Sequence, residues 1–304
     1  MDSMSHLPGT GPLVTVGLPV YNAERHVAHA IECLLAQTFR DFVIVASDNA
    51  STDRTGEICR AYAARDPRIR YHRNATNIGM AGNYNLTFSM ARSKYFRWAT
   101  ADDYSAPEML ADAVAVMEAD PAIALCYPRA YFVDADGRET GRWEDGLHLV
   151  QDDPVARFKA VVRGIGRVHH HLGLMRVDCM ARTGLIAKHV ASDIGFVAEM
   201  ALYGKFFQIP KHQFYRRLHE DSSSWNPGDA HQARRYHAAG VRRVPFNRAR
   251  FYWRYAQAVR RAPLSRGQRL ALYRFLTRLA ISDRDRLAEE SLRDLGLLFR
   301  PEPR

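Results

Sequence analysis

An apolar run that ends in acidic and polar residues occupies residues 42–53, which read FVIVASDNASTD. Its apolar part has the composition of a buried strand and leads into Ser47, Asp48 and Asn49. Further along, the apolar run Tyr95–Ala99 leads in the same way into Asp102 and Asp103. Open α/β sheets bind their ligands outside the carboxyl ends of the strands. The two runs therefore predict a sheet with acidic side chains gathered at one ligand-binding edge.

Strand and helix patterns alternate around these runs. Apolar runs typical of buried strands occur at residues 13–20, 42–46, 69–72, 95–99 and 123–127. Apolar residues with helical spacing occur at residues 24–37, 51–64, 82–91 and 107–119, and Ser51 or Thr52 is expected to cap the second helix. The alternation predicts an α/β protein whose mostly parallel central sheet is covered by helices on both faces.

The pattern is weaker after residue 131. Asp134–Gly137 is expected to form a turn between two strands, and residues 155–162 and 193–203 are expected to form helices. Two further strands are expected at residues 206–209 and 213–218.

The composition is ordinary for a soluble globular protein, with 304 residues of which 47% are hydrophobic and 25% charged. Residues 1–12 lack the apolar core of a signal peptide and are expected to form a flexible tail. The sequence contains no apolar run of about 20 residues, so no membrane-spanning helix is predicted. The four cysteines are widely scattered, which favours free thiols and a cytoplasmic location over disulfides or a zinc site.

The positive charge is concentrated near the end of the chain. Residues 231–304 contain 18 Arg, no Lys and six acidic residues, so this quarter accounts for the whole net charge of +10. The shift places a boundary near residue 229 and predicts two or three amphipathic, Arg-rich helices after it. Three roles stay open for them: packing against the rest of the protein, formation of a homodimer, or docking on the inner face of a membrane. Interleaved apolar and aromatic residues disfavour nucleic-acid binding.

Three segments resemble the family 2 glycosyltransferases, which have the GT-A fold. These are VGLPVYNAE at residues 16–24, AQTF followed by SDNASTD within residues 36–53, and Asn77–Gly79 with Asn83 and the acidic pair near residue 102. The resemblance covers roughly residues 13–125. It implies a Rossmann-like GT-A domain with a nucleotide-sugar-binding half at residues 13–128, an acceptor-binding half at residues 129–228, and a helical appendage at residues 229–304.

The same resemblance implies roles for individual residues. Donor-binding residues would be Pro19, Tyr21, Asn22, Glu24, Asp48, Asn77, Gly79, Asn83, Asp102 and Arg217. Asp48 would accept a hydrogen bond from a uracil or thymine ring. Asp103 would bind Mg²⁺ or Mn²⁺, and His219 would contact the metal or a phosphate. The first acid of the family's D-x-D motif is Ala101 here, so one acidic ligand is missing. The plainer readings are a solvated turn for the acidic pair and a turn cap for Asp48.

The second half of the site is less sharply indicated. Asp193 matches the family's catalytic base, although an Asp at a helix start also suits an N-cap. Glu199 lies further along the same predicted helix and could be a buried ion-pair partner. Arg216 and Arg217 alternate along a strand, so only one of them should face the site. His169, His171 and Trp225 are candidates for the acceptor pocket, and for the histidines an exposed or hydrogen-bonded loop is the alternative.

The resemblance thus predicts an inverting, metal-dependent glycosyltransferase. It would transfer a sugar from a UDP- or dTDP-sugar to a hydroxyl acceptor in glycan, polysaccharide or glycoconjugate synthesis. The alternative from another class is an inactive GT-A-like protein that binds a nucleotide or a membrane surface. A dinucleotide oxidoreductase is disfavoured, because Gly164-Ile165-Gly166 lacks the third glycine of that fingerprint.

Overall fold

The computed structural model describes residues 11–144, 146–166, 169–189, 191–218 and 246–298. Within these residues a single nine-stranded sheet has the order β3-β2-β1-β4-β8-β6-β9-β5, with β7 paired to β6. Its strands are β1 (Val14–Val20), β2 (Phe42–Asp48), β3 (Ile69–Arg73), β4 (Tyr95–Trp98), β5 (Tyr104–Ser105), β6 (Ile123–Val133), β7 (Glu139–Trp143), β8 (Leu174–Arg176) and β9 (Lys205–Arg217). The predicted α/β fold is confirmed.

The sheet is parallel in its first half and mixed in its second. Strands β3, β2, β1 and β4 are parallel neighbours, as the alternating pattern predicts. The short strand β8 runs antiparallel to both β4 and β6, and so joins this half to the parallel pair β6–β9. The ends of β1, β2 and β4 therefore lie at the same edge of the sheet.

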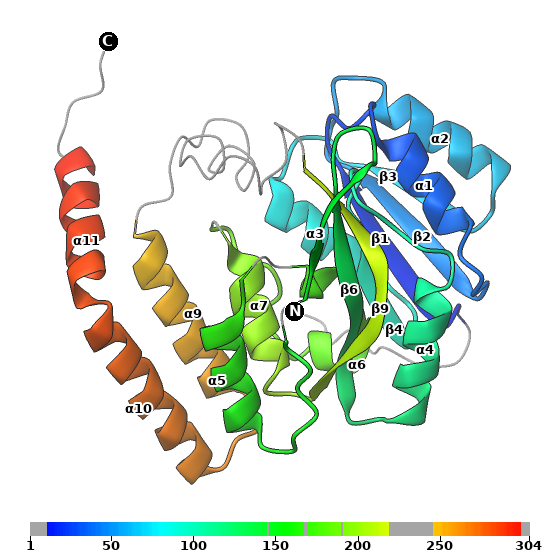
Figure 1. Cartoon of the computed structure of the whole chain (residues 1–304). Helices are drawn as coiled ribbons and strands as arrows, with labels where there is room; N and C mark the ends of the chain where they lie inside the picture. Colours follow the sequence, from blue (N-terminus) through cyan, green and yellow to red (C-terminus); the bar gives the residue numbers. More distant parts are fainter. Residues whose placement is uncertain (1–10, 145, 167–168, 190, 219–245, 299–304) are drawn as a thin grey trace.

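Helices cover both faces of the sheet (Figure 1). They are α1 (Val27–Leu35), α2 (Thr55–Arg65), α3 (Met80–Ser89), α4 (Met109–Ala119), α5 (Pro154–Gly164), α6 (Val177–Met180), α7 (Ser192–Met200), α9 (Asn247–Arg261), α10 (Arg266–Ser282) and α11 (Arg284–Leu298). Two apolar clusters fill the space between helices and sheet. Gly17 in β1 lets α3 approach closely, because a Cβ at this position would lie 2.5 Å from the Thr87 hydroxyl.

Two local predictions were wrong. The two strands expected at residues 206–209 and 213–218 are the single strand β9, because the register against β6 shifts around Pro128 and Arg129. Pro210 has no N–H to donate to a neighbouring strand. A shift in register beside it lets β9 continue past this proline. Helix α2 begins at Thr55 rather than Ser51, with Arg54 at its N-cap and no side-chain cap bond, since Ser51 and Thr52 belong to the preceding loop.

The Arg-rich region forms packed helices in its described part. Helix α9 lies against α7, and α10 lies against α5 and α9 (Figure 1). Their inner faces bury apolar side chains, including Tyr255, Val259 and Leu272. The break between them falls at residues 262–265, around Pro263.

Two further features concern the thiols and the membrane. All four cysteines are free thiols, as predicted; Cys59, Cys126 and Cys179 are buried and Cys33 is half-buried. None of the helices described here is long and apolar enough to cross a membrane.

Candidate active site

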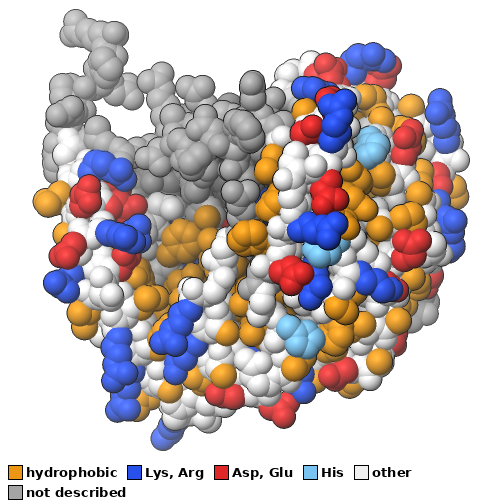
Figure 2. Space-filling view, viewed as in Figure 1, with side chains coloured by type: hydrophobic (Ala, Val, Ile, Leu, Met, Phe, Trp, Pro, Cys, Tyr) orange, Lys and Arg blue, Asp and Glu red, His pale blue; other side chains and the backbone are white. Residues whose placement is uncertain are grey.

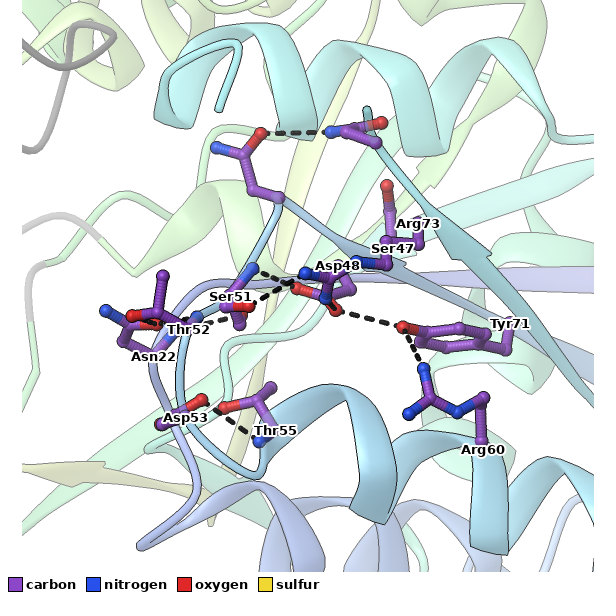
Figure 3. A network of polar contacts seen from close by, with 12 residues as sticks. Asn22, Ser47, Asp48, Ser51, Thr52, Asp53, Thr55, Arg60, Tyr71 and Arg73 are labelled. Atoms are coloured by element: carbon purple, nitrogen blue, oxygen red, sulfur yellow. Dashed lines mark hydrogen bonds and ion pairs between the residues drawn. The ribbon is translucent and has the colours of Figure 1, made fainter. Parts of the chain in front are cut away.

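The loops that follow β1 and β2 are joined to each other by hydrogen bonds (Figure 3). The Asn22 N–H donates to the Ser51 hydroxyl at 3.1 Å, and the Asn22 side-chain oxygen accepts from the Thr52 N–H at 2.9 Å. The Glu24 carboxylate accepts from the Arg54 N–H at 2.9 Å. Asn22 and Glu24 therefore shape the edge of the site. Tyr21 directly follows β1 and is 48% exposed, so its ring is accessible to a ligand.

Asp48 ends β2 as a fully buried carboxylate. Its Oδ1 accepts from the Ser51 N–H at 2.8 Å, and its Oδ2 accepts from the Tyr71 hydroxyl at 2.9 Å and from the Arg73 guanidinium (Figure 3). Burial alone would raise the pKa of Asp48, but hydrogen bonds from Ser51 and Tyr71 and the charge of Arg73 hold the pKa below its ordinary value. Asp48 is therefore ionised. Its Oδ1 accepts only from Ser51 among the described residues and keeps lone-pair capacity for a second donor, although the carboxylate is enclosed in this structure.

A cluster of asparagines joins the loop after β3 to the end of β2. The Asn49 amide donates to the Asn77 side chain at 2.8 Å, and the Asn49 oxygen accepts from Asn74 at 3.0 Å. Asn83 accepts from the Ser47 hydroxyl at 2.7 Å and donates to the Ser47 carbonyl at 2.8 Å. Asn77 and Asn83 thus hold this loop in place, and their predicted contact with the donor stays a prediction.

Gly79 has a backbone role in the same loop. It has φ of +79° at the N-cap of α3, a conformation that glycine adopts without strain. Pro19 is buried in β1. It belongs to the sheet and not to the loop that follows β1.

The acidic pair lies on a turn between β4 and β5. Asp103 is half-buried, and its two oxygens accept from the Thr100 hydroxyl and from the Arg217 N–H, each at 2.9 Å. Burial, followed by the adjacent charge of Asp102, raises the pKa of Asp103 to about 7. The turn is fixed to β9 by stacking of Tyr104 on Tyr215, with ring centroids 4.6 Å apart. The reading of Asp103 as part of a solvated turn is wrong.

Asp193 is the second residue of α7 and does not cap the helix. The N-cap is Ala191, with no side-chain cap bond, so the N-cap reading is wrong. Asp193 Oδ2 lies 3.8 Å from Nδ1 of His171. Burial raises the pKa of Asp193, while the charge of Arg216 lowers it.

The three consecutive histidines are buried instead of forming an exposed loop. His170 and His171 lie in a short 3₁₀ helix, and the ring of His169 lies 3.3 Å from the Pro128 carbonyl. Burial, with help from Arg216, lowers the pKa of His171 to about 3, so His171 is neutral beside Asp193. His171 therefore lies at the site, whereas His169 stacks within the core on Phe214.

Arg216 and Arg217 have different surroundings, as the alternation along a strand requires. The Arg217 guanidinium donates to the Asp102 carbonyl at 3.1 Å and to the Ala135 carbonyl at 2.6 Å, so it fastens two turns together. The charge of Arg216 instead lowers the pKa values of Asp103, His171 and Asp193. Arg216 is thus the cation shared by the two acidic parts of the site.

The described residues include two adjacent acids at this point but no group of three or more His, Cys, Asp or Glu side chains arranged for a metal. Asp102 and Asp103 supply carboxylate oxygens, the donors that Mg²⁺ and Mn²⁺ favour. Mg²⁺ is commonly bound by one or two carboxylates together with substrate phosphates, so the donor set fits such an ion. His219 and Trp225 lie outside the described residues.

Sequence reasoning missed Tyr71 and Arg73, the donors that hold Asp48, and the pairing of His171 with Asp193. The spacing of residues in the sequence predicts neither pairing, because each joins residues from elements that are far apart along the chain. Arg73 stands opposite Asp48 through the register between β3 and β2, which the sequence does not show.

The model of the family described as "Glycosyl transferase family 2" matches residues 15–178, more than half of the chain. The chain belongs to glycosyl transferase family 2. An uncharacterized glycosyltransferase of Methanocaldococcus jannaschii is 34% identical over 128 residues, which are 41% of this chain and 44% of that protein. Chondroitin synthase of Pasteurella multocida is 24% identical over 215 residues, which are 70% of this chain and 21% of the synthase. The matched part is thus less than half of either relative.

Solved structures support the fold of this family 2 member. S. aureus TarS 1–349 in complex with UDP has a TM-score of 0.64 at 17% identity, covering 88% of this chain and 71% of that chain. The mannosyltransferase PcManGT of Pyrobaculum calidifontis, in complex with GDP-Man and Mn²⁺, has a TM-score of 0.57 at 17% identity, covering 97% and 78%. These likenesses establish the GT-A fold.

Proposed function

We propose that this protein is an inverting glycosyltransferase that transfers a sugar from a UDP- or dTDP-sugar to a hydroxyl acceptor. The observation that carries the proposal is the bond that fixes the acidic turn to β9, where the Arg217 N–H donates to Asp103. The adjacent Arg216 acts electrostatically on both Asp103 and Asp193. A leaving group and a base must lie on either side of the sugar carbon in a single displacement. Family membership supports the reaction class.

The donor is proposed from the chemistry of Asp48 and from the structural neighbours. An ionised carboxylate accepts the ring N–H of uracil or thymine. Guanine also offers ring and amino N–H groups, so Asp48 by itself does not select the base, and the preference for a UDP- or dTDP-sugar comes from the family resemblance and from TarS. TarS has been solved with UDP and with UDP-GlcNAc. PcManGT has been solved with GDP-Man, so the fold itself accepts more than one base. The exposed Tyr21 ring would lie beside the base or ribose.

Asp102 and Asp103 would hold Mg²⁺ or Mn²⁺, which when bound stabilises the negative charge that develops on the departing diphosphate. Burial next to Asp102 raises the pKa of Asp103, and a cation there relieves that repulsion. Arg216 would add a second positive charge on the same side of the sugar. Arg217 would act through the turn that carries the pair.

Asp193 would take the proton from the acceptor hydroxyl. The acceptor oxygen then forms its bond to the anomeric carbon, and the bond from that carbon to the diphosphate oxygen breaks, with its electron pair leaving on the diphosphate. Neutral His171 lies next to Asp193 and would orient the carboxylate and contact the acceptor. His169 stacks on Phe214 and lies beside the Pro128 carbonyl, so no contact with an acceptor is proposed for it.

Slow hydrolysis of a panel of nucleotide sugars tests the proposal without knowledge of the acceptor. We expect UDP- or dTDP-sugars to be hydrolysed by the wild-type protein. The variant Asp193→Asn should keep its nucleotide affinity and lose about 100-fold or more in turnover, because general-base catalysis contributes that much. Asp136→Asn, at an exposed carboxylate, is the matched control and should behave as wild type.

Two results would contradict the proposal. Full turnover in Asp193→Asn would place the base elsewhere. Nucleotide binding with no hydrolysis of any donor, and no transfer to any hydroxyl acceptor tested, would favour the alternative of an inactive nucleotide-binding relative.

A further inference from the structure

A basic groove lies between α5 and α10, built from residues that the candidate active site does not use. It has a volume of about 460 Å³. Helix α5 contributes Lys159 and Arg163, and α10 contributes Arg274 and Arg278. Figure 2 shows Lys and Arg side chains gathered over this part of the molecule, at the lower left. We call this the α5–α10 groove.

No carboxylate neutralises the groove within the described part of the chain. Helices α5 and α10 contain no acidic residue, and none of the four cations forms an ion pair with a described acid. The nearest acid along the chain is Asp283, whose Oδ2 already accepts from the Arg248 guanidinium at 2.7 Å. Four positive charges therefore converge with no counter-charge among the described residues.

The ring of Phe275 holds two of these cations in position. The Arg163 guanidinium lies 5.1 Å from the ring centroid and the Lys159 ammonium 5.8 Å from it. A cation over an aromatic face keeps its charge and its outward N–H donors. The groove is thus a preformed set of donors for an anion with several oxygens, which is the chemistry of a phosphate group.

The outward face of α10 also carries exposed aliphatic side chains. Leu270 and Ile281 are 50% and 57% exposed. Residues 270, 274, 277 and 281 recur at helical spacing, so both aliphatic side chains share one stripe with Arg274. A free phosphate ion gives no reason for exposed aliphatic side chains on this stripe. A lipid surface does, because basic residues contact its headgroups while aliphatic ones enter its acyl boundary.

We propose that the α5–α10 groove and the outward stripe of α10 dock this protein on an anionic phospholipid membrane. The phosphates of the lipid headgroups bind the four cations, and Leu270 and Ile281 enter the interface. This proposal stands on residues separate from the candidate active site and does not depend on which reaction the protein catalyses.

Vesicle co-sedimentation of the full-length protein tests the proposal. We expect binding to vesicles of phosphatidylglycerol and phosphatidylcholine and none to pure phosphatidylcholine. The double variant Arg274→Gln/Arg278→Gln should weaken binding by about 30-fold, since each basic residue near an anionic surface adds about a factor of five. Arg65→Gln/Arg70→Gln removes the same charge from exposed positions of the nucleotide-binding half and is the matched control. Equal weakening by the two double variants would overturn the proposal.

A second variant separates a lipid surface from a site for free phosphate. Leu270→Ser/Ile281→Ser changes no charge, and both side chains are exposed, so the fold should be retained, as circular dichroism would verify. This variant should lose vesicle binding while its affinity for inorganic phosphate stays at the wild-type value. Unchanged vesicle binding by Leu270→Ser/Ile281→Ser would contradict membrane docking. So would a wild-type protein that binds inorganic phosphate but does not bind anionic vesicles.

Discussion

At the scale of single residues, burial and one shared cation set the protonation states of the candidate site. Burial raises the pKa of Asp193, Arg216 opposes that shift, and His171 is neutral because burial lowers its pKa to about 3. At any pH above about 3, His171 stays neutral, so Asp193 is the one of these two residues that changes charge in the acidic range. The proposed base must be ionised to act, so activity is expected to fall as the pH drops through the pKa of Asp193.

Arg216→Gln should shift this fall in activity to higher pH. The positive charge lowers the pKa values of both Asp193 and Asp103, and its removal lets both rise, so a higher pH is needed to ionise these carboxylates. The measurement is kcat as a function of pH for the variant and the wild type. Arg142→Gln, at an exposed arginine, should leave the profile unchanged. If the fall in kcat at acidic pH occurs at the same pH or at a lower pH in Arg216→Gln, this electrostatic account is contradicted.

The residues of the site were predictable where a side chain follows a strand or starts a helix. Asp48, Asp103 and Asp193 lie where the sequence pattern indicates, although their roles stay proposals. The ionic partner suggested for Glu199 is confirmed. The donors to Asp48 were not predictable, because Tyr71 and Arg73 face it only through the register between β2 and β3.

At the scale of elements, a buried ion-pair cluster joins α7 to α9. Glu199 is fully buried, lies 2.8 Å from the Arg261 guanidinium and 3.4 Å from that of Arg254, and accepts from the Gly184 N–H at 3.1 Å. Arg254 passes close to Gly195, where a Cβ would lie 2.9 Å from its Cγ. The helix that carries Asp193 is therefore held by the C-terminal region.

Glu199→Ala should lower the free energy of unfolding by about 3–5 kcal/mol, because it leaves buried Arg254 without its counter-charge. Urea unfolding measures this loss. The matched comparison is Asp136→Ala, which breaks an exposed pair with Arg138 and should cost less than about 1 kcal/mol. Similar unfolding midpoints for Glu199→Ala and the wild type would show that the cluster does not stabilise the join.

Element types were predictable where periodicity is strong and less so where pairing decides. The first four strands follow from apolar runs. The continuity of β9 past Pro210 depends on a register shift against β6, and the three-residue strand β8 depends entirely on its two neighbours. Neither effect leaves a local pattern in the sequence.

At the scale of the whole molecule, the Arg-rich region has a packed inner face and a basic outer face. Composition alone predicted a boundary near residue 229, which lies outside the described residues, and indicated the charge, but it left packing and docking open. The structure confirms packing, since apolar side chains of α9 and α10 belong to the same core cluster as those of α5 and α7. Packing uses the buried side chains of α10, and the proposed docking uses its exposed ones, so the two roles are compatible.

A chain that ends at residue 245 should precipitate or unfold without cooperativity, because loss of α9, α10 and α11 exposes the apolar faces of α5 and α7. A chain that ends at Asp283 lacks only α11 among the described helices and is the control. It should stay soluble, since Leu292 and Leu295 of α11 are largely exposed. Solubility and thermal unfolding measure both. A soluble, cooperatively folded protein that ends at residue 245 would show that the helices are a detachable appendage.

Calorimetric titration of UDP with and without Mn²⁺ tests most directly whether Asp48 and Asp103 serve one nucleotide site. We expect Asp48→Ala to weaken UDP binding by at least about ten-fold under both conditions, because a hydrogen bond to a charged group is lost. Asp103→Ala should abolish only the part of the affinity that depends on Mn²⁺. Wild-type affinity and wild-type Mn²⁺ dependence in both variants would contradict the account.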